Sequence, residues 1–131
     1  MAAKIDYLEG TAFEKSRAFS RAVVSEGGRT IWLAGQTTLI DEEGRDISGD
    51  CAAQARAIFA LMDKTLHKLG ATLANLVTMT VFINDPRYGD EFVKIRSETF
   101  SEGRYPASAL ITVSGFARPG IVIEIQGVAV V

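Results

Sequence analysis

The sequence has little of the chemistry on which many active sites depend. It contains a single cysteine, Cys51, and a single histidine, His67. One thiol cannot form a disulfide within the chain, and one thiol with one imidazole does not make a zinc site. Neither a GxxxxGK[ST] phosphate loop nor a GxGxxG dinucleotide fingerprint is present. We therefore expect no metal and no cofactor, and we expect a reducing compartment, the cytoplasm.

Long apolar runs and a strong charge of one sign are also absent. The start, MAAKIDYLEG, has no apolar signal-peptide core, and no segment approaches the ~20 apolar residues of a membrane span. Lys and Arg number 14 against 16 Asp and Glu, which gives a formal net charge of −2. The basic residues are scattered rather than clustered. This pattern favours neither nucleic acid nor a membrane as a partner, and it gives no support to a ribonuclease role.

What the chain does have is the composition of an ordinary globular domain. Its 131 residues are 47% hydrophobic and 23% charged, which is enough to bury a core. No repeat, low-complexity run or Pro/Gly-rich linker divides the chain. We therefore expect one domain over residues 1–131.

Hydrophobic periodicity predicts an α+β layer of one sheet and two helices in the order β-β-α-β-α-β-β. The expected elements are strands over 19–24 and 30–34, a helix over about 48–69, a strand over 76–83, a helix over about 87–101, and strands over 107–114 and 121–131. A Gly27-Gly28 turn predicts that the first two strands pair as a hairpin. Residues 1–18 are mixed and weakly patterned.

Several predicted strands are apolar on both faces, although two helices can cover only one face of a sheet. In the strand at 76–83, alternation places Leu76 and Phe82 on one face and Met79 and Val81 on the other. An exposed hydrophobic face of this kind usually marks an interface. We therefore expect the chain to oligomerise through its sheet.

The last strand contains one carboxylate and one carboxamide in an otherwise apolar run, IVIEIQGVAVV. Residues two apart in a strand share a face, so Glu124 and Gln126 lie on the same side. Because burying an unpaired carboxylate is costly, a partly buried Glu124 indicates a chemical role. The alternatives are a solvated Glu124 or one held by backbone donors. For Gln126 a structural role is expected.

Several short segments, in this order and at this spacing, together resemble the Rid family (reactive intermediate/imine deaminases, also called YjgF). They are FSRAV at 19–23, IWLAGQT at 31–37, GD and AQAR within 49–56, LGATLANLVTMTVFIND at 69–85, phenylalanines at 92 and 100, YPAS at 105–108, and VIEIQGVAV at 122–130. The resemblance implies a chorismate-mutase-like fold, with one mixed sheet, two helices on one face, and a trimeric barrel. It also implies clefts between subunits that hydrolyse enamines or imines without metal or cofactor.

The resemblance implies roles for particular residues. Glu124 falls on the family's strand carboxylate, which lies near the imine and the attacking water, and Gly35 and Gln36 match its glycine-rich strand end. The family's substrate-gripping arginine follows Tyr/Phe-Pro-Ala, and that position is Ser108 here. Where the family has an aromatic residue with a hydroxyl group, this chain has Phe19, which lacks the hydroxyl.

Loss of that arginine changes the expected substrate. A charge-assisted arginine contact is worth about 1.5–3 kcal/mol, against about 1 kcal/mol for a neutral hydrogen bond. Arg21 is the preferred substitute and Arg104 the alternative, while Ala107 and Phe116 complete the expected cleft. We expect a cofactor-free deaminase of an enamine, imine or related small unsaturated amino compound, in a homotrimer. The alternatives are a catalytically inactive trimer that binds a small metabolite, and a protein-interaction trimer with a vestigial cleft.

Overall fold

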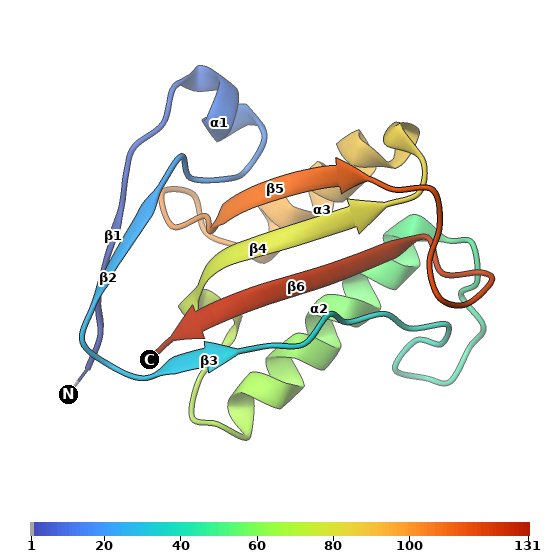
Figure 1. Cartoon of the computed structure of the whole chain (residues 1–131), viewed down its shortest axis with the longest axis horizontal. Coiled ribbons are helices and arrows are strands. Elements are labelled where there is room, and N and C mark those ends of the chain that lie inside the picture. The colour runs from blue at the N-terminus through green and yellow to red at the C-terminus, as the bar shows by residue number, and fades with distance from the viewer. Residues whose placement is uncertain (1) are drawn as a thin grey trace.

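The computed structural model describes residues 2–131, which form a four-stranded mixed sheet with two helices packed on one face (Figure 1). The elements of this layer are β3 (Thr30–Trp32), α2 (Cys51–His67), η1 (Leu73–Asn75), β4 (Leu76–Ile83), η2 (Pro86–Tyr88), α3 (Gly89–Thr99), β5 (Ala107–Thr112) and β6 (Ile123–Val130). The strand order is β3-β6-β4-β5, with β4 and β5 parallel and the other neighbours antiparallel. The predicted α+β architecture is confirmed.

Helix α2 forms where the sequence predicts it, because its start, its buried stripe and its end all agree. The Asp50 side chain accepts a hydrogen bond from the Ala53 amide, a cap worth roughly 1 kcal/mol. Ile58, Met62 and Leu66 follow at intervals of one helical turn and are fully buried against the sheet. The chain leaves the helix through Gly70 at φ +78°, a conformation that glycine adopts readily.

The two central strands bury one face against the helices and leave the other open. Met79 and Val81 of β4, and Ile125 of β6, are at most 1% exposed on the helix side. The sequence alternation is wrong for Leu76, which is 1% exposed and belongs to the buried face. A register shift between Leu76 and Thr78 inserts an extra residue and reverses the facing of the residues before it.

The predicted hairpin is wrong. Strand β2 (Val23–Glu26) pairs with β1 (Lys4–Tyr7) in a separate two-stranded ribbon, and the short helix α1 (Ala12–Ser16) lies between them. Strand β3 instead pairs with β6, and Arg29 extends that pairing by exchanging backbone hydrogen bonds with Val131 at 2.6 and 3.0 Å. The Gly27-Gly28 turn therefore connects the two sheets instead of closing a hairpin. Strand β2 finds its partner, β1, within residues 1–18.

A buried glutamine fixes the chain just before β6. Gln54 is 0% exposed, and its amide donates to the carbonyls of Ile47 (3.0 Å) and Gly120 (2.7 Å). Its side-chain oxygen accepts from the Val122 amide at 3.0 Å. All of its polar groups are satisfied, so it ties α2 to the loop that leads into Glu124.

Within the described residues, no helix has the length and apolar character needed to cross a membrane.

Candidate functional site

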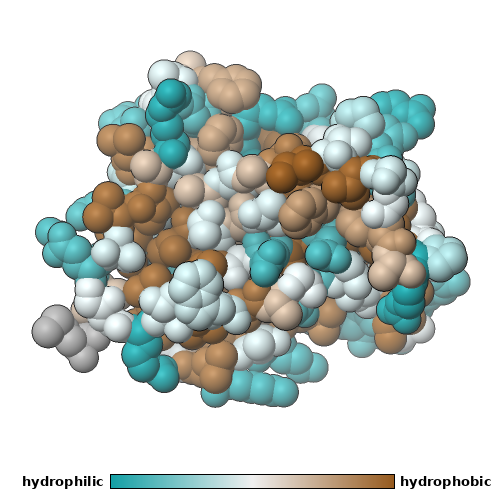
Figure 2. All heavy atoms as spheres, in the orientation of Figure 1, coloured by the Kyte–Doolittle hydropathy of each residue, from teal (hydrophilic) through white to brown (hydrophobic). Residues whose placement is uncertain are grey.

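The sheet face away from the helices is only partly covered. Its residues, row by row across the strands, are Trp32, Val128, Thr78 and Ala107, then Gln126, Thr80 and Ala109, then Glu124, Phe82 and Ile111. Trp32 is 78% and Ile111 42% exposed. Figure 2 views this face and shows hydrophobic residues over β5 and over the β1–β2 ribbon, with paler and polar residues between them. We call these rows the open face.

Glu124 is the one acidic residue in the rows of the open face, and it is half-buried. It packs against Gly35, where a Cβ atom would lie only 2.5 Å from Glu124 Oε2. Gln36 holds this segment beside β6 by exchanging backbone hydrogen bonds with Ile125 at 2.8 and 3.2 Å. The Gln36 side chain donates to the Ala34 carbonyl at 3.0 Å. Gly35 and Gln36 therefore form one wall beside the carboxylate.

A second group of predicted site residues gathers at the start of β5. Ser20 donates its amide to the Pro106 carbonyl at 3.0 Å, which brings Phe19 and Arg21 to this strand. Ala107 lies on the open face. Ser108 points to the opposite, helix-covered side, because it is level with Met79 in the parallel pairing.

A single chain therefore does not bring Glu124 and Ser108 together. Glu124 lies on the open face, level with Phe82 near the start of β6, whereas Ser108 lies on the other face near the start of β5. The two strands run in opposite directions and are separated by β4 (Figure 1). Phe116 is half-buried in the loop between β5 and β6. That loop is at the end of the sheet where β6 begins.

Arg21, the preferred substitute for the missing arginine, already has an acidic partner. Its Nη1 lies 2.8 Å from Oε1 of Glu14, a residue of α1 that is 2% exposed. Hydrogen bonds from the Thr11 hydroxyl and then from Arg21 lower the pKa of Glu14 to about 2. The other candidate, Arg104, lies over the Tyr7 ring, 5.8 Å from its centroid.

The structure adds an arginine that the sequence analysis missed. Arg96 of α3 is 2% exposed and donates from Nη1 to Ser108 Oγ at 2.7 Å and from Nη2 to the Arg17 carbonyl at 2.9 Å. The signal was its spacing: Arg96 follows Phe92 and precedes Phe100 by one helical turn each, so a charged residue falls on an apolar stripe.

The remaining reactive groups do not compete with Glu124. Burial, followed by the nearby Glu91 and Asp50 carboxylates, raises the pKa of the Cys51 thiol to about 12, so the thiol stays protonated and unreactive. His67 lies on the exposed side of α2, with Nδ1 2.8 Å from the Asp63 carbonyl. Across residues 2–131, no three side chains of the metal-binding types cluster.

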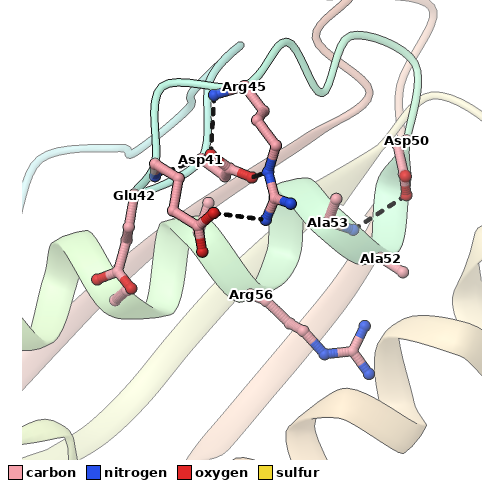
Figure 3. A pocket seen from close by; sticks show the side chains of 10 residues that line it. Asp41, Glu42, Arg45, Asp50, Ala52, Ala53 and Arg56 are labelled. Atoms are coloured by element: carbon pink, nitrogen blue, oxygen red, sulfur yellow. Dashed lines mark hydrogen bonds and ion pairs between the residues drawn. The ribbon is translucent and has the colours of Figure 1, made fainter.

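Two surface hollows lie apart from Glu124. One, of about 370 Å³, lies between α2 and the loop before it, and Figure 3 shows the side chains that line it, with Arg45 directed toward Asp41. Arg45 pairs with Asp41 at 2.7 Å and with Glu43 at 3.4 Å, while Asp50 caps α2. The other hollow, of about 460 Å³, lies beside Phe19 and is lined by Tyr7, Leu8, Glu9, Gly10, Lys15, Ser20, Glu102, Gly103 and Tyr105.

The layered fold agrees with the comparisons to known proteins. A family model described as Endoribonuclease L-PSP matches residues 9–131. The chain belongs to this family, also known as the YjgF/Rid family.

Named relatives cover most of the chain. The protein DfrA of Myxococcus xanthus is 32% identical over 117 residues, which span 86% of this chain and 84% of DfrA. The mouse 2-iminobutanoate/2-iminopropanoate deaminase is 28% identical over 114 residues, spanning 86% of this chain and 80% of the mouse protein.

Solved structures share the whole fold. The Rid-family protein YyfB of Yersinia pestis superposes with a TM-score of 0.81 at 25% identity and covers 100% of both chains. A YjgF-family protein of Mycobacterium tuberculosis superposes with a TM-score of 0.68 at 27% identity, covering 99% of this chain and 100% of the other.

Proposed function

We propose that this protein is a cofactor-free hydrolytic deaminase that acts on an enamine, an imine or a related small unsaturated amino compound in the cytoplasm. The observation that carries the proposal is the position of Glu124, a lone half-buried carboxylate on the open face against Gly35. Family membership and a mouse relative named as an imine deaminase support it.

The open face supports assembly into a homotrimer. Trp32 and Ile111 expose apolar area there, and Phe82 and Val128 are half-buried beside them. Aromatic and aliphatic groups of this kind dominate the cores of stable interfaces. Packing open faces together around a threefold axis would bury these residues and exclude water from Glu124.

A cleft that uses both Glu124 and Ser108 would have to form between protomers, because one chain holds the two residues on opposite faces of its sheet. In this arrangement Glu124, Gly35, Gln36 and Phe116 come from one protomer. Phe19, Ala107 and Ser108 come from the β5 edge of its neighbour, because Ser108 does not lie on the open face. The Arg21 charge stays with Glu14, so Arg21 would border the cleft rather than bind the substrate.

The proposed chemistry needs one proton shuttle. Water attacks the imine carbon, the new C–O bond forms as the C=N π electrons move to nitrogen, and Glu124 accepts the proton lost by water. Glu124 returns that proton to the nitrogen to give a carbinolamine. It then carries the hydroxyl proton to the nitrogen as the C=O double bond forms and the C–N bond breaks, so that a carbonyl compound and ammonia leave. A positioned carboxylate of this kind typically contributes 10²–10⁴-fold to the rate.

The direct test supplies 2-aminoacrylate, generated in situ by a pyridoxal-phosphate dehydratase, and then an aminomuconate-like enamine. The lifetime of the imine is measured by trapping it with semicarbazide, and ammonia release is followed in parallel. We expect wild type to shorten the imine lifetime and Glu124→Gln to lose that effect. The matched control is Glu42→Gln, which removes an exposed loop carboxylate and should leave the rate unchanged.

The alternative is a trimer that binds a small metabolite without turnover. Binding of an enamine analogue without ammonia release would favour it, and full activity in Glu124→Gln would remove the assigned role of that residue. Since the family description names an endoribonuclease, the same preparations should also be incubated with single-stranded RNA. Cleavage there, without imine turnover, would replace the deaminase proposal.

A further inference from the structure

Among the residues that the structure describes, no acidic side chain balances the positive charge of Arg96. Within residues 2–131 its hydrogen bonds go to two uncharged oxygens, Ser108 Oγ and the Arg17 carbonyl, and its buried Nε has no partner. Burial, with a smaller contribution from the nearby Arg17 guanidinium, lowers the pKa of Arg96 to about 10, so the group is still charged at neutral pH. Burying a charge without a counter-ion destabilises the folded state. Features of this kind are expected mainly at functional sites.

Neutral neighbours hold this guanidinium in one position. It lies 5.1 Å from the centroid of the Phe92 ring and 5.9 Å from that of the Phe19 ring, both within cation–π range. The guanidinium also donates a hydrogen bond to the carbonyl of Arg17. The next residue, Ala18, adopts a φ of 58°. Left-handed backbone is disfavoured for alanine, so the surrounding structure maintains a strained turn at this point.

The hydrogen bond from Arg96 leaves Ser108 with a free hydroxyl hydrogen. Ser108 Oγ accepts from Arg96 Nη1 at 2.7 Å, and its own contact to the Ala109 carbonyl, at 3.4 Å, is too long for a normal O–H···O bond. A hydroxyl that accepts from a cation is a stronger donor toward the next group.

Ser108 is also within reach of a ligand, whereas Arg96 is not. Ser108 is half-buried, compared with 2% exposure for Arg96. It lies on β5, the edge strand of the sheet, and within the described residues no strand pairs with the outer edge of β5 beyond the bridge at Ala107. Ser108 is therefore partly exposed beside an unpaired edge of the sheet.

We propose that Ser108 and Arg96 act together as an anion-recognition pair, in which the Ser108 hydroxyl donates to a carboxylate oxygen of a small organic acid. Ser108 touches the ligand, and Arg96 is a positioning residue that polarises the hydroxyl and supplies the balancing charge. This inference rests on the proposed function, because it assigns the carboxylate end of that substrate class to this position. One polarised donor binds one oxygen, so the pair recognises the charge of the ligand without the two-point geometry of a direct guanidinium contact.

The test measures binding of 2-oxobutanoate, a stable 2-oxo acid, by calorimetric titration of the intact protein. Its neutral isostere 2-oxobutanamide serves as the matched ligand. We expect the amide to bind wild type at least about tenfold more weakly than the acid, and Ser108→Ala and Arg96→Met each to weaken binding of the acid roughly tenfold or more. Neither variant should change binding of the amide. Arg45→Met removes an arginine already paired with Asp41 and should change nothing.

Thermal stability separates this role from a structural one. Methionine replaces an uncompensated buried charge with an apolar side chain of similar length, so we expect the Tm of Arg96→Met to stay level or rise while binding of the acid falls. Arg96→Lys should restore part of that binding, because it keeps the charge. If Arg96→Met does not fold, Ser108→Ala and Arg96→Lys make the same comparison.

The outcomes distinguish this inference from the proposed function. Unchanged binding of the acid in Ser108→Ala and Arg96→Met, or no binding to wild type, overturns the recognition pair even if the protein releases ammonia. Binding of the acid that depends on both residues supports the pair even if no enamine is hydrolysed, in which case only the deaminase proposal fails.

Discussion

Gly35 and Glu124 are in such close contact that residue 35 cannot carry a side chain while the carboxylate keeps its position. A Cβ on residue 35 would lie 2.5 Å from Glu124 Oε2 and 3.0 Å from its Cδ. The reason is space rather than backbone geometry, because Gly35 does not adopt a left-handed φ. The glycine therefore acts on the carboxylate alone, which makes it a selective probe of the site.

We expect Gly35→Ala to reduce deaminase activity at least about tenfold with little loss of stability. The end of the Glu124 side chain can rotate away, so the fold survives. Replacing glycine with alanine at a compatible φ can even stabilise a protein by ~0.4–1 kcal/mol through the unfolded state. Turnover and Tm are measured on the same preparation. Gly115→Ala is the matched control, because no atom of the described part of the chain lies within 4 Å of a Cβ at that residue. Full activity in Gly35→Ala would show that the position of the carboxylate is unimportant.

The open face predicts that Trp32→Lys prevents trimer formation without unfolding the chain. Trp32 is 78% exposed in a single chain, so a polar substitution there changes monomer stability by no more than about 0.5 kcal/mol. At an apolar interface the charge of the introduced lysine would be unpaired and buried, which is strongly destabilising. Light scattering should report three chains for wild type and one for Trp32→Lys.

Two further observations check that prediction. Leu61→Lys changes an apolar residue of α2 that is 38% exposed on the helix side, and it should leave the trimer intact. Trp32 is the only tryptophan, so its fluorescence should shift to longer wavelength as wild type is diluted into monomers. A wild-type protein that is monomeric at all concentrations would remove the interface.

The Glu14–Arg21 pair predicts a specific loss of stability in acid. The pKa of Glu14 is lowered from 4.5 to about 2, so the folded state binds fewer protons than the unfolded state between these values. The stabilisation of the folded state by the Glu14 carboxylate is complete above about pH 4.5 and disappears as the pH falls toward 2. Glu14→Gln should therefore have a lower Tm than wild type at pH 7, and the gap should close across this window. A gap that stays constant with pH would contradict the pKa shift.

The sequence predicts those parts of the fold that depend on local pattern. The helix over 51–67 and the strands over 76–83 and 123–130 appear where periodicity and capping residues place them. The partner of β2 could not be predicted, because strand pairing joins residues distant in the chain and β1 has no pattern of its own. Alternation also fails at Leu76, where a bulge changes the facing of the strand.

The site was predictable as a set of residues but not as an arrangement. The resemblance singles out Glu124 and Ser108, yet only the strand order shows that one chain keeps them on opposite faces. Arg21 was a reasonable choice from position, but its partner Glu14 could not be inferred from sequence spacing alone. Arg96 escaped notice because a charged residue on a helix is usually solvated, and its burial depends on α3 packing against Phe19.

Mixed trimers provide the strictest test of a cleft shared between protomers. Glu124→Ala and Ser108→Ala are each expected to be poorly active as homotrimers. If every site takes Glu124 from one protomer and Ser108 from the next, random assembly of the two variants restores both residues in about one quarter of the sites. Refolding an equal mixture should therefore raise the specific activity to about a quarter of the wild-type value, well above the average of the two homotrimers. The separately refolded and then combined variants are the control. No gain on mixing would mean that each complete site lies within one chain. That result would contradict the proposal that Glu124 and Ser108 reach the cleft from different protomers.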